Sequence, residues 1–428
     1  MDRRIFESVF MLNAAIRPST VRLAYFALVG SLMMLQARGQ VTQTPDLTLA
    51  QAMLQAQSTW MPLKADTLMV QAAQRDAKAH PMLEPAQLNS EWGQINSVYR
   101  DQGLQINQVF RLPGVYKTQR TIAQIRLEGA KIENERTLAS LTCDLVKTYY
   151  QFLVLNRKIK LLQYNDSLLT ETVKILKIHH LKGQISTSDL NQILLIQGES
   201  SINLQSVTQE SAKTLGWFQF LTGSTSTPKI SDSIIWTEGL NNLRPTLVNP
   251  DLKWLANQSN EAMATSHLSR QSRFPGWSLG LRNMSIQGMA PDGNLYPLSR
   301  RFNALQMGLV FPLWGKSLRE QAQASRLRSE AMSTTYRHGI AQLEIQQNQS
   351  MLEILSLQNQ WAQFTQTLIP LTNDLTRQAN AQLATGELDL IQWTHTLQRI
   401  MQTNESQLQL ALNLNHALIR HHYPNLIP

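Results

Sequence analysis

Two long stretches almost free of Pro and Gly constrain this chain more than any other feature. The first, residues 116–182, contains no Pro and a single Gly, Gly129. The second, residues 316–384, contains one Pro, Pro370, which predicts a kink. A continuous helix as long as the first stretch would measure about 100 Å. The chain is therefore expected to be elongated rather than globular.

Apolar residues in the first stretch form a narrow seam with polar flanks. They recur at spacings of three and four, as in a heptad repeat with one polar break. Such a seam predicts a helix that packs against other helices. The seam consists of Leu138, Leu141, Leu145, Thr148, Phe152, Leu155, Ile159 and Leu162.

Each long stretch is preceded by a similar short sequence motif, called here a junction phrase. LQINQVFRLPG (residues 104–114) and LQMGLVFPLWG (residues 305–315) share Leu, Gln, Val, Phe, Leu and Gly at equivalent positions. Apolar and polar residues alternate in both, which indicates a strand with one apolar and one polar face. Each phrase is expected to be the last strand of a hairpin. Gln108 interrupts the apolar face of the first copy, where Leu309 continues it in the second.

The order of predicted elements suggests an internal duplication. A Ser/Thr/Pro-containing linker, residues 223–249, separates the two halves. The first repeat spans 40–222, with a helix, a hairpin at 87–112, a long helix at 116–182 and a returning helix at 189–221. The second spans 250–428, with a helix, a hairpin at 274–311, a long helix at 316–384 and a returning helix at 388–422.

Residues 1–39 have the organisation of an export signal. Basic residues precede an apolar run, residues 23–35, and small residues follow it just ahead of Gln40. The run is shorter than the roughly 20 residues that a membrane-spanning helix needs. We expect a signal peptide cleaved before Gln40, with an N-terminal membrane anchor as the alternative. The basic region is long, so Met11 is an alternative start of translation.

Composition narrows the function classes. Apolar residues make up 43% of the chain and charged residues 16%, which is too apolar for a disordered protein. The formal charge is +9, but the basic residues are scattered and do not cluster with aromatic ones, so nucleic-acid binding is not expected. The single cysteine, Cys143, excludes an intramolecular disulfide and is expected to be a packed residue.

No motif suggests catalysis, a cofactor or a metal site, so the chain is not expected to be an enzyme. There is no phosphate-binding Gly-rich loop, no nucleophile elbow and no zinc-protease motif. The pairs His179-His180 and His421-His422 are adjacent residues, which point about 100° apart on a helix and cannot chelate one ion well.

The two hairpins supply four strands, too few to close a barrel. If their apolar faces meet lipid, every strand edge must be paired, so several copies of the chain must combine. Three copies would give twelve strands, and cyclic symmetry is the usual way to build such a ring. Pro and Gly suit the sharp passage from strand to helix. The predicted junction residues are Pro113, Gly114, Pro312 and Gly315.

With this order of elements, the chain resembles the TolC-like outer-membrane efflux proteins. The resemblance rests on LTLAQAM (residues 47–53), the two junction phrases, and the turns KGQISTSDL and ATGELDLIQ. It also rests on the two-fold order of elements over most of the chain. EWGQINSVYRDQG (residues 91–103) is similar to the branch that accompanies heavy-metal and cation pumps.

The resemblance implies an α+β membrane protein that forms a homotrimer. Each protomer would contribute four strands to a twelve-stranded barrel in the lipid of the bacterial outer membrane and long helices to a periplasmic tunnel. Such proteins are exit ducts that dock on a periplasmic adaptor and an inner-membrane pump, here expected to be of the resistance-nodulation-division type. Heavy-metal cations are the implied substrate, with drugs as the alternative. The competing interpretation is an exported periplasmic coiled-coil structural protein without a barrel.

The turns after the two long helices are expected to form the periplasmic tip, because both lie at the helix ends opposite the strands. Several family members carry acidic residues six and nine positions after the second Gly, where this chain has Gln392 and His395. Leu388 stands where some members place an Arg. The gate candidates are therefore Gly183, Ser186, Gly386, Glu387, Asp389, Gln392 and His395.

Aromatic residues in or near the strands are candidates for an interfacial girdle, with ordinary packing as the alternative. Trp314 lies at a strand-to-helix junction, which would place it at the periplasmic boundary. The girdle candidates are Trp92, Tyr99, Trp277, Tyr296 and Trp314.

Overall fold

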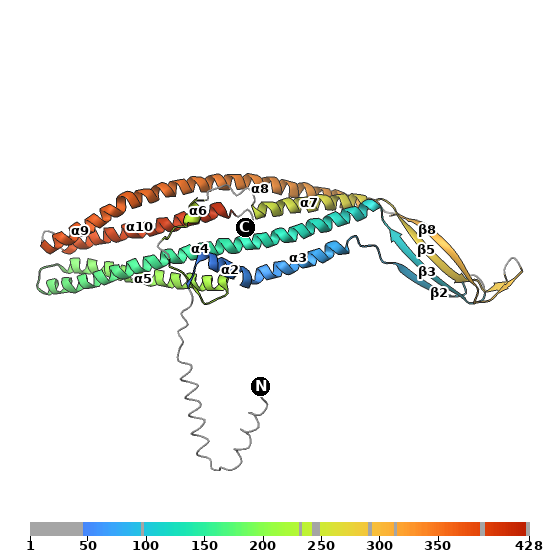
Figure 1. Cartoon of the computed structure of the whole chain (residues 1–428), viewed down its shortest axis with the longest axis horizontal. Helices are drawn as coiled ribbons and strands as arrows, with labels where there is room; N and C mark the ends of the chain where they lie inside the picture. The colour runs from blue at the N-terminus through green and yellow to red at the C-terminus, as the bar shows by residue number, and fades with distance from the viewer. Residues whose placement is uncertain are drawn as a thin grey trace, which may run out of the picture. The chain divides into compact units, whose positions relative to one another are not determined.

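The computed structural model describes residues 46–95, 98–230, 233–241, 249–289, 293–311, 315–385 and 390–424. The chain from Asp46 onward forms one unit. Within this unit, a four-stranded sheet lies at one end and long helices extend away from it (Figure 1). The fold is thus rich in helix and contains one larger sheet, as the two hydrophobic periodicities predict.

The sheet has the order β2-β3-β5-β8, and all neighbours are antiparallel. The central pair, β3 and β5, joins strands that lie far apart in the sequence. A small hairpin of β6 (Gly288–Met289) and β7 (Leu295–Tyr296) lies between β5 and β8 in the chain. The four sheet strands are β2 (Gln87–Gly93), β3 (Asp101–Phe110), β5 (Gly276–Ser285) and β8 (Arg301–Val310).

Two helices precede the sheet, α2 (Leu49–Thr59) and α3 (Met61–Ala79). Thr48 begins α2 with a reciprocal cap: its hydroxyl accepts from the backbone N–H of Gln51, and the Gln51 side chain accepts from the Thr48 backbone N–H. Trp60 separates the two helices in an extended conformation. Pro62 in the first turn of α3 has no N–H to continue the hydrogen bonds of α2, which explains the break.

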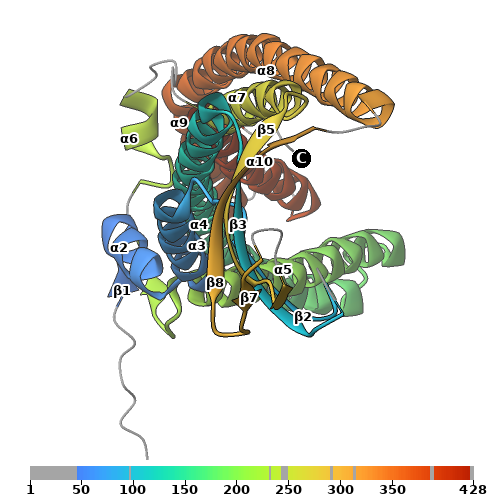
Figure 2. The same ribbon diagram turned by 90° about the vertical axis from the view of Figure 1, so that its right-hand side faces the viewer.

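Each sheet strand adjoins a helix, and the helices keep the order of the strands. Near the sheet, α3, α4, α7 and α8 lie side by side (Figure 1). Farther away, α5 and α10 take the places of α3 and α7 beside the two longest helices. Figure 2 shows the same layers from the sheet end. The helices are α4 (Pro113–Leu181), α5 (Thr187–Thr222), α7 (Pro250–Gln271), α8 (Gly315–Gln363), α9 (Ile369–Thr385) and α10 (Leu390–His422).

A π turn, η1 (Phe364–Leu368), separates α8 from α9 directly before Pro370, where the sequence predicts a kink. The Ile369 N–H donates to the Phe364 carbonyl five residues earlier. Pro370 cannot donate a backbone hydrogen bond, and a π turn is one way a helix accommodates such an interruption.

The middle of the unit holds most of the apolar core. The α4 seam is confirmed, because six of its eight residues are buried and the other two pack against buried clusters. Short elements close the region: β1 (Asp46–Leu47) pairs with β4 (Thr227–Pro228), and α6 (Thr237–Asn241) lies against α10. Cys143 packs beside this core, and burial raises the pKa of its thiol to about 11, so it stays protonated at neutral pH.

Candidate functional site

The sheet has one face, here called the outer face, that is mainly apolar and open to solvent. Strand register aligns Leu88 with Ile106, Ile106 with Leu281, and Leu281 with Leu305 in one row. Neighbouring rows on this face carry further exposed apolar residues. The exposed apolar residues of the outer face are Leu88, Trp92, Leu104, Ile106, Trp277, Leu281, Leu305, Met307 and Leu309.

A few polar residues share the outer face toward the end of the sheet away from the helices. Asn283 and Asn303 are paired in the register, and Asn283 Nδ2 donates to Asn303 Oδ1 at 2.7 Å. Ser90 of β2 lies on the same face. Most of the apolar residues of the face, Trp92 excepted, therefore occupy its middle and its helix end, where Gln108 is the polar exception.

The opposite face, here called the inner face, is polar or small over most of its area. Carboxamides dominate it, and Gly occupies positions where strands approach closely. A Cβ at Gly280 would lie 3.0 Å from the Ile106 carbonyl oxygen. The polar and small residues of the inner face are Gln87, Asn89, Glu91, Gly103, Gln105, Asn107, Ser278, Gly280, Arg282, Ala304, Gln306 and Gly308.

One ion pair crosses the inner face. Arg282 Nη2 of β5 donates to Glu91 Oε2 of β2 at 3.0 Å, and the two residues reach each other over Gly103 on the strand between them. Both side chains remain partly open to solvent. The sequence did not reveal this pair, although the alternation of the two hairpins places both residues on the polar face.

The end of the sheet away from the helices is held by a buried carboxylate. Asp101 is 1% exposed. It accepts hydrogen bonds from the Ser285 hydroxyl at 3.2 Å and from the Gln287 N–H at 2.7 Å. Arg301 donates to the Gln102 carbonyl nearby. These contacts tie the start of β3 to the end of β5, and sequence reasoning missed them as well.

The predicted girdle aromatics lie in different settings. Trp277 stacks on Phe110 at 4.5 Å between ring centroids, at the helix end of the outer face. Trp92 is exposed in β2. Tyr296 of β7 contacts the Phe302 ring and the Arg300 guanidinium. Tyr99 lies outside the strands. Trp314 lies outside the described residues.

The predicted junction residues mark the starts of two helices. Pro113 is the first residue of α4, a position that favours Pro. Gly114 lies close to the Gln271 side chain of α7. At the other junction, α8 begins at Gly315, and Pro312 lies outside the described residues.

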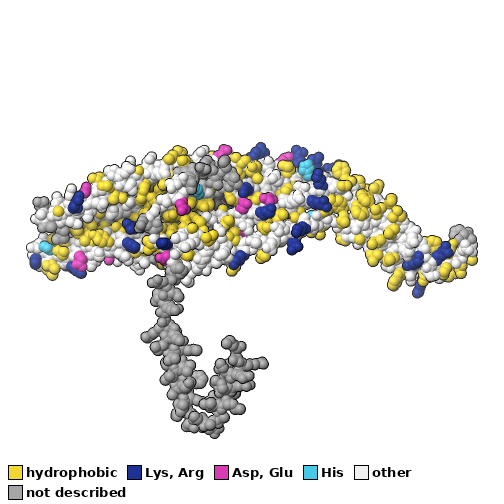
Figure 3. All heavy atoms as spheres, in the orientation of Figure 1, with side chains coloured by type: hydrophobic (Ala, Val, Ile, Leu, Met, Phe, Trp, Pro, Cys, Tyr) yellow, Lys and Arg dark blue, Asp and Glu magenta, His cyan; other side chains and the backbone are white. Residues whose placement is uncertain are grey.

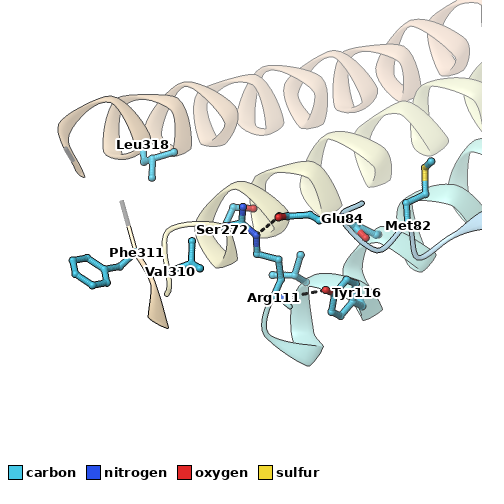
Figure 4. A pocket seen from close by; sticks show the side chains of 10 residues that line it. Met82, Glu84, Arg111, Tyr116, Ser272, Val310, Phe311 and Leu318 are labelled. Atoms are coloured by element: carbon cyan, nitrogen blue, oxygen red, sulfur yellow. Dashed lines mark hydrogen bonds and ion pairs between the residues drawn. The ribbon is translucent and has the colours of Figure 1, made fainter. Parts of the chain in front are cut away.

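A cavity of about 490 Å³ lies where the sheet meets the helices, between the start of α4 and the start of α8 (Figure 4). Arg111 Nε donates to Glu84 Oε1 at 2.7 Å beside it, and the Arg111 N–H donates to the Tyr116 hydroxyl at 2.9 Å. Gln108 Nε2 donates to the Glu84 carbonyl at 2.7 Å. The polar residue that interrupts the apolar pattern of β3 therefore anchors the segment leading into β2.

The turn between α4 and α5 is built from predicted tip residues. Gly183 has a φ of +70°, a left-handed conformation that favours Gly, and its N–H donates to the His180 carbonyl at 2.9 Å. Ser186 caps α5, because its hydroxyl accepts from the Asp189 N–H at 3.1 Å.

The end of α9 and the start of α10 lie beside the first turn, at the end of the unit opposite the sheet (Figure 1). Gln392 and His395 are exposed on the first turns of α10. Between them, Trp393 is buried and its Nε1 donates to Asn380 Oδ1 of α9 at 2.9 Å, which joins the two helices. The remaining candidates for the tip, Gly386, Glu387 and Asp389, lie outside the described residues.

Two other kinds of site are absent from the part of the chain that the structure describes. None of the helices there combines the length and the hydropathy that a membrane-spanning helix requires. No three His, Cys, Asp or Glu side chains in those ranges come together as metal ligands would.

No protein-family model matches the sequence, and no curated protein sequence matches it either. Solved structures do match its fold. The outer-membrane channel OprN has a TM-score of 0.69 at 15% identity, over 88% of this chain and 89% of that one. CusC, whose structures concern folding and transmembrane channel formation, has a TM-score of 0.71 at 14% identity, over 89% and 92%. The outer membrane protein VceC from Vibrio cholerae has a TM-score of 0.67 at 14% identity, over 86% and 95%.

These similarities extend over nearly the full length of both partners in each comparison. The protomer therefore shares the fold of these outer-membrane proteins.

Proposed function

We propose that this chain is an outer-membrane exit duct of the TolC-like family. One observation carries the proposal: a sheet with an exposed apolar face, whose strands adjoin long helices in the same lateral order. A water-soluble protein rarely exposes a continuous apolar face of this kind, whereas a sheet in a lipid bilayer requires it. The fold shared with OprN, an outer-membrane channel, supports the same function.

The sheet requires partners at both edges. In the described part of the chain, β2 and β8 are each hydrogen-bonded on one side only. In a bilayer such edges are costly, so β2 of one protomer is proposed to pair with β8 of the next. Three copies then close a twelve-stranded barrel with the outer face toward lipid and the inner face toward the lumen.

An internal duplication explains how one chain supplies one third of the ring. The order helix, strand, strand, long helix, helix occurs from α3 to α5 and again from α7 to α10. The organisation proposed for the chain is a signal peptide at 1–39, repeats at 40–222 and 250–428, and a linker at 223–249. The barrel then lies in the outer membrane and the helices form a tunnel in the periplasm.

The two turns opposite the sheet are proposed as the tip that opens and contacts a periplasmic adaptor. Gln392 and His395 are exposed there, and the Trp393–Asn380 hydrogen bond ties the two helices that would carry the gate. The duct performs no catalytic step. An inner-membrane pump of the resistance-nodulation-division type supplies energy and selects the substrate, proposed to be metal cations, with drugs as the second class.

Purified protein tests this function. In detergent, light scattering should give the mass of a trimer, and the same sample should form long-lived conducting channels in planar bilayers. A sample denatured by heating and then added to the bilayer is the control. If the mature protein stays soluble and monomeric without detergent and never conducts, the duct is refuted and the coiled-coil structural protein becomes the better interpretation.

A further inference from the structure

The apolar outer face of the sheet ends where the helices begin, and basic residues follow at once. Leu112, Phe274 and Phe311 are exposed at this end of the apolar face. Six Lys and Arg residues lie in or beside the adjoining turns of α4, α7 and α8. We call them the basic collar: Lys117, Arg120, Arg270, Arg273, Lys316 and Arg319.

The collar charges are open to solvent. All six residues are exposed, and no ion pair between described residues involves any of them. Two carboxylates on the neighbouring segments are engaged elsewhere. Glu84 pairs with Arg111 and Glu261 pairs with Arg126, each at 2.7 Å.

The collar also carries a strong excess of positive charge. The segments 113–125 and 264–275 contain no Asp or Glu. On α8, Glu320 directly follows Arg319 and is exposed. It offsets one of the six basic charges, so a net charge of about +5 remains at this level of each protomer.

The depth of the collar matches a lipid headgroup layer. Lys117 follows the exposed Leu112 by five positions along the start of α4, which corresponds to about 7.5 Å of helix rise. The headgroup region on one side of a bilayer is roughly 5–7 Å thick. Long basic side chains can also bend toward it while their aliphatic stems cover apolar surface. On the face shown in Figure 3, basic side chains gather over the helices beside an apolar region at the junction.

We propose that the basic collar binds anionic phospholipid headgroups in the membrane leaflet that faces the helices. The inference rests on the proposed function, because it requires the sheet to lie in a bilayer. Each Lys or Arg at a membrane surface increases association with anionic lipid about fivefold. In a trimer, three copies of the collar would surround the duct at one depth and fix its vertical position.

Lipid selectivity measures this interaction directly. Wild-type protein is reconstituted in phosphatidylcholine vesicles that contain spin-labelled phosphatidylglycerol or spin-labelled phosphatidylcholine. The fraction of motionally restricted label then gives the relative association of each lipid at low and at high salt. The K117Q/R120Q variant removes two collar charges from α4. The K177Q/K182Q variant removes two exposed charges, one in the last turns of the same helix and one directly after its far end, and is the matched control.

Wild-type protein and K177Q/K182Q are expected to prefer phosphatidylglycerol several-fold at low salt, and high salt should reduce the preference. K117Q/R120Q should lose a large part of it, and a variant with all six collar residues changed to Gln should lose most of it. Equal preference in all variants would overturn the proposal, as would a collar variant that changes only the anion permeability of the channel.

The two proposals can fail separately. A wild-type protein that inserts in phosphatidylcholine bilayers and conducts, but shows no preference between the two lipids, overturns the collar alone. A wild-type protein that does not float with vesicles of either composition overturns the duct and the collar together.

Discussion

His421 Nδ1 and Ser350 Oγ lie 2.9 Å apart in the interior and join α10 to α8. The Ser350 hydroxyl also donates to the Gln347 carbonyl at 2.9 Å, so Nδ1 of the ring is the donor in the first contact. His421 Nε2 is buried without a hydrogen-bond partner among the described residues. A proton placed there would create a buried N–H without an acceptor. Burial, aided by the neighbouring His422, lowers the pKa of His421 below its usual range.

The stability of the helical region should therefore decrease in mild acid. His421 stays neutral in the folded protein at a pH where the unfolded imidazole, with a pKa near 6.5, takes up a proton. Protons then favour the unfolded chain, by at most about 1.4 kcal/mol per pH unit for one histidine. The pKa of His416 is also lowered, chiefly by burial, and adds to the effect.

Thermal unfolding at pH 7.5 and 5.5 measures this loss. H421N keeps a side-chain N–H donor but cannot titrate, so its melting temperature should depend less on pH than that of the wild type. H338Q changes an exposed histidine of α8 and should leave the pH dependence unaltered. A wild-type melting temperature that rises between pH 7.5 and 5.5 would contradict the prediction.

The two faces of β8 should respond differently to the same charge. Met307 lies on the apolar outer face and Gln306 on the polar inner face. A Lys at the lipid-facing midplane costs about 2–4 kcal/mol, whereas one in a watery lumen costs little. M307K should therefore reduce the fraction of heat-modifiable trimer extracted from membranes, and Q306K should leave it near the wild-type level. Equal yields from both variants would show that the outer face does not meet lipid.

Charge in the barrel lumen should shift when the Glu91–Arg282 pair is broken. E91Q leaves the Arg282 guanidinium without its partner at 3.0 Å, so an uncompensated positive charge from each protomer would line the barrel. We expect the ratio of anion to cation permeability to increase in bilayer recordings. The double variant E91Q/R282Q should restore the wild-type ratio, since the pair is neutral. Stability should change by about 1 kcal/mol or less, as is usual for a partly exposed pair.

Asn415 holds the segment before α6 against α10. Its Oδ1 accepts from the Trp236 N–H at 2.9 Å and its Nδ2 donates to the Ile234 carbonyl at 2.8 Å, with the residue 1% exposed. N415L would leave two buried backbone groups unpaired at a cost of about 1–3 kcal/mol each. Denaturant unfolding should show this loss. N413L, on the exposed side of the same helix, should be nearly neutral.

The tip can be tested by adding negative charge to it. Q392D and H395D would each place a ring of carboxylates around the constriction if these residues line it, and cation selectivity should then increase several-fold. Q409D lies on α10 at another exposed position about 20 Å farther from the tip, and a smaller change is expected there. If H395D leaves both conductance and selectivity unchanged, His395 does not face the constriction.

Much of the fold follows from hydrophobic periodicity. The apolar residues of the α4 seam recur at spacings of three and four over many turns. A pattern of that length fits a helix and hardly any other secondary structure. Boundaries are less well determined. The sequence predicts a helix from 116, whereas α4 begins at Pro113, because a proline needs no hydrogen-bond partner for its nitrogen in the first turn. The helix expected ahead of the first hairpin is divided at Trp60 for the related reason that Pro62 cannot donate.

Pairing between distant segments could not be predicted from the sequence. Alternation shows that Glu91 and Arg282 lie on polar faces, but only the β3–β5 register brings them together. The same holds for the contact between Asp101 and Ser285. For the tip, the sequence makes predictions that the structure does not test, because the residues nominated in the second turn lie outside the described ranges. Their role as a gate stays a prediction.

The shared lateral order of strands and helices has a consequence for the width of the two parts of the protomer. Strands in a sheet are about 4.8 Å apart, so four of them span about 19 Å, or about 25 Å around a barrel when tilted by about 40°. Four packed helices at about 9 Å span about 36 Å. The same four positions therefore enclose a smaller circumference in the strands than in the helices. In the proposed duct with its tip open, the bore of the strand ring, and not the wider helical passage, would set the largest object that can leave the cell.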